Sequence, residues 1–426
     1  EEQLDIALGL LGYRVASGNA NWPRLLSAAA RQTVHRKLPS RAPARSMEER
    51  QLAAEGARAL YILGQTAFMH GDAVGSLRAA IQALNFAERA AVEENMALNY
   101  AIVALTVSGV PAPRIARHYC RLALAALERN PSTPERARAV EALAVYAIAN
   151  GDWEFAGPFA KEAEALFERL QHRRYRDEST GLRALVAYWG GDLPLAARLW
   201  TECALSAEHR GDLMAICWGR AGLVEVELRR GRRSAESLLA ELERIHHPER
   251  LPVGEVVRLH GARSRCLLLA GDATGALAEA RRGLACVAGV KRPISYSLPG
   301  YELLQDTLIE LDRAGAAAVD GELAEIVDRI GNFARIHPIA GPAYHYGRGY
   351  RSRRAGRASA ARQAWQESLS RAERLQMPYE QARAHLALAT LATDEGRAEH
   401  LRAARALYQR VGAQSPPPRE PVASAS

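Results

Sequence analysis

The chain has 426 residues, of which 48% are hydrophobic and only 6% aromatic, and Ala, Leu, Arg and Glu dominate its composition. These strong helix formers leave little room for β-sheet. Lys and Arg (56) exceed Asp and Glu (48) by 8, a surplus that is modest for a chain of this length and argues against a protein specialised for nucleic acid.

Cysteine usage and hydropathy limit the class further. The five cysteines are odd in number and form no Cys-x-x-Cys pair, which excludes a disulfide framework and favours free thiols in a reducing cytosol. No run of about 18 apolar residues and no signal-peptide pattern occurs, so we expect a cytoplasmic protein. The chain begins with Glu1 inside a helix-like stretch, which suggests a piece of a larger protein.

The first segments predict a helical pair and a linker. Residues 1–40 carry two apolar stretches at helical spacing, LDIALGLLGYRVA and WPRLLSAAARQTVHR, separated by a turn. Residues 41–47 contain Pro and Arg and are predicted to be a linker. Ser46 is expected to cap the next helix, with Glu49 completing a capping box.

Residues 48–288 are predicted to be regular helical repeats, because Gly-Asp turns recur on a fixed grid. The turn glycines are Gly71, Gly151, Gly191 and Gly271, and Gly231-Arg232 falls on the same grid. The skipped position is filled by another helix breaker, Pro111. A 40-residue period with one breaker per period is typical of a stacked helical-repeat array.

Small residues keep fixed offsets from each turn. The position seven before the turn Gly is occupied by Gly64, Ala104, Ala144, Ala184, Val224 and Ser264, and the position five after it by Ser76, Ala116, Ala156, Ala196 and Ala276. Small residues at both positions let two antiparallel helices approach closely. These offsets resemble those of the tetratricopeptide repeat, whose period is 34.

Regularity decreases after Gly271. Residues 289–350 are predicted to be an irregular repeat with Pro/Gly-rich loops at 289–300 and 331–347. Residues 351–413 return to helical repeats, with breaks expected at Gly356 and Gly396. Residues 414–426 lack apolar periodicity and are predicted to be a disordered tail. The predicted fold is all-α: a right-handed superhelical α-solenoid of about nine antiparallel helix pairs, tetratricopeptide-like with a 40-residue period.

Three stretches carry a family resemblance: residues 61–90, 362–389 and 400–413, above all ALNFAERA and AERLQMPYEQA. They resemble the C-terminal tetratricopeptide-like region of large bacterial signalling ATPases, in which AAA/STAND modules are fused to protein kinase or class III nucleotidyl cyclase domains. The resemblance covers roughly residues 45–413. It implies a regulatory array for a catalytic domain elsewhere in the chain. The catalytic and nucleotide-binding motifs of that family do not occur here.

No phosphate loop, dinucleotide fingerprint, nucleophile elbow or metal-binding His-Glu-x-x-His motif occurs, so we expect no catalytic residue, cofactor or metal. In tetratricopeptide-like arrays the first helix of each pair lines the concave face. The corresponding offsets predict a partner-binding groove rich in Tyr, Trp and Arg, the residue types enriched at binding hot spots. Its predicted members are Arg58, Tyr61, Gln65, Arg138, Glu141, Tyr188, Trp189, Trp218, Glu225, Arg229, Arg258, Arg265, Tyr346, Tyr350, Arg353 and Arg354.

The leading hypothesis is a non-catalytic protein–protein interaction and regulatory array that binds a protein or peptide, one of acidic character, on its concave face. Two alternatives stay open. One is a nucleic-acid-binding helical repeat that uses the arginines. The other is an enzyme or small-ligand sensor with a cleft between the two loops of residues 289–350. For the tryptophans, filling of space between repeats is an equal alternative to lining a groove.

Overall fold

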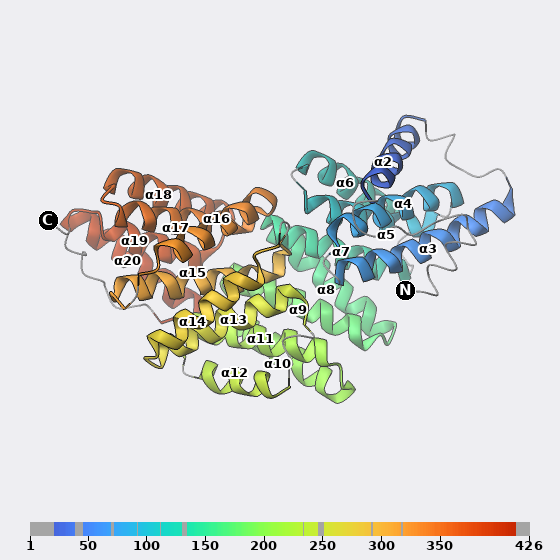
Figure 1. Ribbon diagram of the computed structural model, residues 1–426. Coiled ribbons are helices and arrows are strands. Elements are labelled where there is room, and N and C mark those ends of the chain that lie inside the picture. Colours follow the sequence, from blue (N-terminus) through green and yellow to red (C-terminus); the bar gives the residue numbers. More distant parts are fainter. Residues whose placement is uncertain are drawn as a thin grey trace. The chain divides into compact units, whose positions relative to one another are not determined.

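The computed structural model describes residues 21–38, 46–69, 72–91, 93–110, 112–129, 134–232, 234–245, 251–290, 293–316 and 318–414. Within these ranges the regular structure is nineteen α-helices and two short 3₁₀ helices, without a strand (Figure 1). Helix α2 is followed by nine successive helix pairs, which confirms the predicted all-α solenoid. The predictions for residues 1–20, 39–45 and 415–426, and for Gly71 and Pro111, lie outside the described residues.

The chain divides into two compact units, residues 1–146 with 162–171, and residues 147–161 with 172–426. Unit 1 contains the following helices: α2 (Asn21–Lys37), α3 (Met47–Met69), α4 (Ala73–Ala90), α5 (Glu93–Ser108) and α6 (Pro113–Arg129). Helices α7 (Pro134–Asn150) and α8 (Trp153–Arg169) are divided between the two units.

Unit 2 contains the remaining helices. They are α9 (Arg173–Gly190), α10 (Leu193–Arg210), α11 (Leu213–Arg230), α12 (Ser234–Ile245), α13 (Val253–Leu269), α14 (Ala273–Cys286), η4 (Ser295–Ser297), α15 (Leu298–Arg313), α16 (Asp320–Ile336), η5 (Pro338–Ala340), α17 (Gly341–Arg354), α18 (Ala358–Arg374), α19 (Pro378–Ala389) and α20 (Asp394–Val411). In the part of the chain that is described, none of the helices is long and apolar enough to cross a membrane.

The Gly-Asp turns have the chemistry that the sequence predicts. Gly191 and Gly271 adopt φ values of 88° and 87°, the left-handed region that favours glycine. The following Asp caps the next helix: an Asp192 carboxylate oxygen accepts a hydrogen bond from the Leu195 amide at 3.0 Å. Gly211 (φ 67°) and the capping Asp212 form the same kind of turn between α10 and α11, which belong to different helix pairs. This turn lies half of the 40-residue period after Gly191. The Gly-Asp turn therefore marks both kinds of helix connection.

The predicted small-residue positions are close-packed. Ala104, Ala144, Ala184, Ala156 and Ala196 are completely buried. A methyl group at any of them fills the space between paired helices, so a larger side chain would push the helices apart. The predicted helix start at Ser46 is also confirmed, since its hydroxyl accepts a hydrogen bond from the Glu49 amide at 3.1 Å.

The predicted loop at 331–347 is wrong. Helix α16 continues to Ile336, and α17 begins at Gly341 after a single 3₁₀ turn. The glycines serve close helix contact: a Cβ on Gly331 would lie 2.7 Å from the Tyr344 ring, and one on Gly349 would lie 2.3 Å from the Trp365 indole. The break predicted at Gly396 is wrong as well, because Gly396 lies in the first turn of α20.

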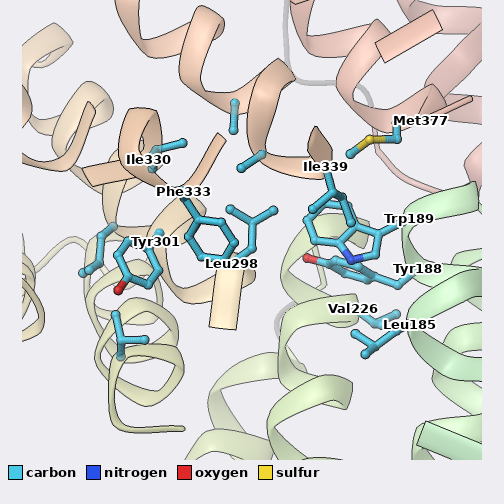
Figure 2. Close-up of a cluster of buried hydrophobic side chains, with 14 of the residues drawn as sticks. Leu185, Tyr188, Trp189, Val226, Leu298, Tyr301, Ile330, Phe333, Ile339 and Met377 are labelled. Carbon is cyan, nitrogen blue, oxygen red and sulfur yellow. The ribbon is translucent and has the colours of Figure 1, made fainter. Parts of the chain in front are cut away.

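The core of unit 2 joins its early and late helices. Figure 2 shows Tyr188 and Trp189 beside Ile339 and Met377 in one buried apolar cluster. Further contacts hold the ends of the unit together, such as the hydrogen bond of 2.5 Å from the Trp153 indole N–H to the Leu375 carbonyl. The segment predicted to contain a cleft therefore contributes Leu298, Tyr301 and Phe333, among others, to a packed core.

Candidate functional site

Arg229, near the end of α11, is the centre of a buried ionic network. Its Nη2 donates hydrogen bonds of 2.9 Å to Glu302 Oε2 on α15 and to Glu380 Oε1 on α19. All three side chains are at least 95% buried. Because α11, α15 and α19 are the first helices of their pairs, the network lies on the helix set expected to face the inside of the array.

Three aromatic rings surround the same guanidinium. Arg229 Cζ lies 3.9 Å from the ring centroid of Tyr188, 4.6 Å from that of Trp189 and 4.4 Å from that of Tyr379. Distances below about 6 Å allow cation–π attraction, which strengthens when water is excluded. The cation is thus held by two carboxylates and three π faces, which come from the three helices α9, α15 and α19.

The network continues through Arg383 on α19. Arg383 Nη1 donates to Glu380 Oε2 at 3.1 Å, and Arg383 Nη2 pairs with Asp306 on α15. The guanidinium also stacks over the Tyr346 ring, 4.4 Å from its centroid. Carboxylates and guanidiniums therefore alternate along this inner face.

A second buried cluster surrounds Arg258 on α13. Its guanidinium makes a bidentate pair with Glu225 on α11, at 2.7 and 2.9 Å, and contacts Glu255 at 3.0 Å. The half-buried Trp218 indole hydrogen-bonds to Glu255. Paired, planar contacts of this kind orient the side chains strictly.

Carboxylates outnumber guanidiniums in these two clusters. The two clusters contain five carboxylates and three guanidiniums. The carboxylates are those of Glu225, Glu255, Glu302, Asp306 and Glu380, and the guanidiniums those of Arg229, Arg258 and Arg383. Burial, followed by repulsion from Glu380, raises the pKa of Glu302 to about 8. Burial opposes the charge of Arg229, but Tyr188 and the two carboxylates outweigh it and raise the pKa of Arg229. Arg229 therefore stays charged while Glu302 takes up a proton near neutral pH.

Several buried polar atoms of this inner face have no hydrogen-bond partner among the described residues. They are Arg229 Nη1, Glu302 Oε1, Gln305 Oε1 and His345 Nδ1. Such atoms cost free energy in a closed structure, and each retains capacity for a ligand group. Within the described ranges no group of three His, Cys, Asp or Glu side chains could hold a metal ion.

Unit 1 has a smaller counterpart. The Tyr61 hydroxyl on α3 accepts hydrogen bonds from Gln65 Nε2 at 2.9 Å and from Arg138 Nε on α7 at 3.0 Å. Arg138 also pairs with the buried Glu141. Arg58 lies on α3 with 60% of its side chain exposed. Four of the five groove residues predicted in this region are thus brought into one cluster.

The late predicted residues lie apart from Arg229. The Tyr350 hydroxyl donates to Asp312 at 2.7 Å, and Arg354 pairs with the same carboxylate at 3.0 Å. Arg353 is half-buried on the same helix. Arg265 on α13 is half-buried and is an electrostatic neighbour of Asp306.

The predicted groove therefore needs correction in its centre. Tyr188, Trp189 and Arg229 are expected to face a partner, but they are 3%, 1% and 7% exposed. The reason is tertiary: α19, from the end of unit 2, packs against α9 and contributes Tyr379 and Glu380 to the same cluster. The residues do converge, but they bind one another.

The sequence reading missed six members of the network. They are Glu255, Glu302, Asp306, Tyr379, Glu380 and Arg383. One offset would have found Glu302, which lies 13 residues before the turn at Gly315, as Arg258 lies 13 before Gly271. Tyr379 and Glu380 belong to AERLQMPYEQA, the stretch that carries the family resemblance. Glu255 lies 16 residues before Gly271, the same offset that Glu55 and Glu135 have from Gly71 and Gly151. Asp306 follows no offset that the other repeats share.

Comparisons with known proteins support the fold. Neither a family model nor a curated protein sequence matches this chain. Among solved structures, the chain is similar to a Rap protein complexed with competence and sporulation factor, with a TM-score of 0.50 and 14% sequence identity. The match covers 82% of this chain and 99% of that one. At this identity the likeness shows a shared fold: the chain is an all-helical repeat protein of the Rap-like, tetratricopeptide-like architecture.

Proposed function

We propose that this chain is a non-catalytic protein-interaction and regulatory array whose inner helices in unit 2 bind a protein or peptide effector. One observation carries the proposal. A caged guanidinium and its paired carboxylates are buried on the inner helix set, and Arg229 Nη1 and Glu302 Oε1 retain unused hydrogen-bonding capacity. The Rap protein of the same fold, which was solved in complex with competence and sporulation factor, supports a binding role.

The effector would act by exchanging partners within the network. A carboxylate or carbonyl oxygen of the effector would accept from Arg229 Nη1. Glu302 Oε1 would donate to an effector acceptor when it is protonated and accept from an effector N–H group when it is ionised. Since Arg229 ties α11 to residues 73 and 151 positions further along the chain, such an exchange would change how the late helices of unit 2 pack on the early ones. An effector can shift this packing only by its differential affinity for the two arrangements.

The wider context follows from the resemblance. We propose that the array works in the cytosol and controls a catalytic domain elsewhere in a larger bacterial signalling protein, of the ATPase-associated kinase or cyclase type. The partner need not be acidic, because the inner clusters themselves have an excess of carboxylates. A ligand with both donor and acceptor groups suits them better.

The test compares inner and outer substitutions in the intact chain. Glu302→Gln keeps the shape of the side chain and replaces one carboxyl oxygen by an amide nitrogen, which cannot accept a hydrogen bond. Arg402→Gln changes an exposed arginine of α20 and serves as control. We expect a genuine effector to bind wild type and Arg402→Gln equally and Glu302→Gln at least several-fold more weakly, and to alter amide exchange in α11 and α19. Equal binding by all three proteins would show that the effector site lies elsewhere.

A further inference from the structure

Helix α6 in unit 1 presents a stripe of arginines to solvent. Arg114, Arg117 and Arg121 are spaced at i, i+3 and i+7 and are all exposed, so they share one side of the helix. The opposite side is buried through Tyr119 and Ala123, among others. The stripe is about 10 Å long, from seven residues at 1.5 Å each.

The charges of these three arginines are unpaired within the described part of the chain. None of them has an ion pair or a hydrogen bond with any residue that the structure describes. Some other exposed arginines pair with carboxylates, as Arg281 does with Glu322. The α6 stripe is therefore a set of cations whose partners do not come from the described part of this chain.

The end of α2 adds to the same positive surface. The Arg36 guanidinium hydrogen-bonds to the Tyr119 phenol and so lies against α6, and Lys37 follows it, exposed. His118, on α6 beside the stripe, has its pKa lowered by burial and then by the charges of Arg36 and Arg121. Cations of both helices are thus close enough to repel a further positive charge.

The carboxylate that acts electrostatically on Tyr119 is already engaged. Glu88 on α4 lies 2.6 Å from His35 Nδ1 and accepts from Gln32 Nε2 at 3.0 Å. Burial raises the pKa of Glu88 to about 7. It is therefore only partly ionised at neutral pH and does little to balance the surface.

We propose that this α2–α6 basic surface, formed by Arg36, Lys37, Arg114, Arg117 and Arg121, is a docking site for an acidic helical segment of a partner protein. Carboxylates at i, i+3 or i+4, and i+7 of a partner helix would repeat the spacing of the stripe and accept charge-assisted hydrogen bonds.

One observation favours a protein helix over nucleic acid. Ile115 is 45% exposed beside the stripe and offers an apolar contact to a partner helix. The surface consists of unit 1 residues only, so the inference does not depend on the network around Arg229.

The test uses a fluorescein-labelled, 20-residue helical peptide with Glu at the complementary spacing and one Leu to meet Ile115. A peptide with Gln in place of Glu and a 20-nucleotide single-stranded RNA serve as comparison probes. The intact chain is tested as wild type, as Arg117→Gln/Arg121→Gln, and as Arg402→Gln/Arg405→Gln. The last variant removes the same charge from exposed, unpaired helical positions of α20.

We expect the Glu peptide to bind wild type and the α20 variant alike, and the α6 variant about tenfold more weakly, with affinity falling as salt rises. The Gln peptide should not bind. Equal binding by the two double variants, or no binding of the Glu peptide at all, would overturn the proposal. Tighter binding of the RNA, lost in the α6 variant, would assign the surface to nucleic acid instead. Both substitutions are at exposed positions, and circular dichroism checks that the helices remain.

Discussion

Replacement of Arg229 by Met tests the buried network most directly. The substitution removes two hydrogen bonds of 2.9 Å to carboxylates and three cation–π contacts. Charge-assisted hydrogen bonds contribute about 1.5–3 kcal/mol each, and desolvated cation–π contacts add up to about 2 kcal/mol. The total is reduced because Glu302, with a pKa of about 8, can stay protonated without its partner, and because Met keeps much of the apolar contact. We expect unit 2 to lose about 3 kcal/mol of stability.

The assay is urea unfolding followed by tryptophan fluorescence. Five of the six tryptophans belong to unit 2, so the change in fluorescence reports mainly on that unit. Arg282→Met is the matched control: its side chain is 67% exposed and pairs with Glu279, three positions earlier in the helix, and we expect a loss below about 0.5 kcal/mol.

A double-mutant cycle isolates the pairing of Arg229 with Glu302. If the two interact as the structure shows, Glu302→Gln should cost measurably less in the Arg229→Met background than in wild type, with a coupling of about 1–2 kcal/mol. If Arg229→Met costs no more than Arg282→Met, or if the two substitutions are additive, the network does not hold unit 2 together.

Three further predictions concern protonation, close packing and capping. Because the pKa of Glu302 is raised to about 8, the folded state between about pH 5 and 8 keeps a proton that the unfolded chain has already lost, so the free energy of unfolding should fall as pH rises through this window. Glu302→Gln should flatten that slope in urea titrations, and an unchanged slope would assign the proton to another group. Gly261→Ala places a Cβ 2.6 Å from a backbone oxygen of α15 and should cost about 2 kcal/mol of unfolding free energy. Gly190→Ala is the control: its Cβ would have no atom within 4 Å, so the variant should be neutral or slightly stabilising. Similar melting temperatures for the two variants would contradict this packing. Asp272→Ala removes the carboxylate that accepts a hydrogen bond from the Gly275 amide at 2.8 Å. The variant should lose about 1 kcal/mol of unfolding free energy and show faster amide exchange in the first turn of α14. Unaltered exchange there would argue against the cap.

Local chemistry explains which predictions from the sequence are confirmed. A Gly in the left-handed region followed by a capping Asp needs only residues within about one helical turn, so the turns at Gly191 and Gly271 are readable from the sequence. Gly151 and Gly231 share the left-handed conformation. The small residues around each turn recur because both helices of a pair are close in the chain.

The errors arise where one residue type has two physical uses. Gly331 and Gly347 follow the pattern of a loop, but they lie inside helices and permit contact with Tyr344 and with Gln305 and Val327. Pro342 likewise stands in the first turn of α17, where its missing N–H costs little. Only the neighbouring helix distinguishes these uses from a break.

The predicted groove residues also depend partly on local sequence and partly on long-range packing. Offsets from the turns place Tyr188, Trp189 and Arg229 on the inward side of their helices, and the structure does bring them together. Whether inward side chains meet a partner or one another depends on Glu302 and Glu380, which lie 73 and 151 residues further along the chain. A repeat pattern specifies helices and their nearest neighbours. The packing of α19 on α9 and α11, which buries these charges, is a long-range contact that no local pattern encodes.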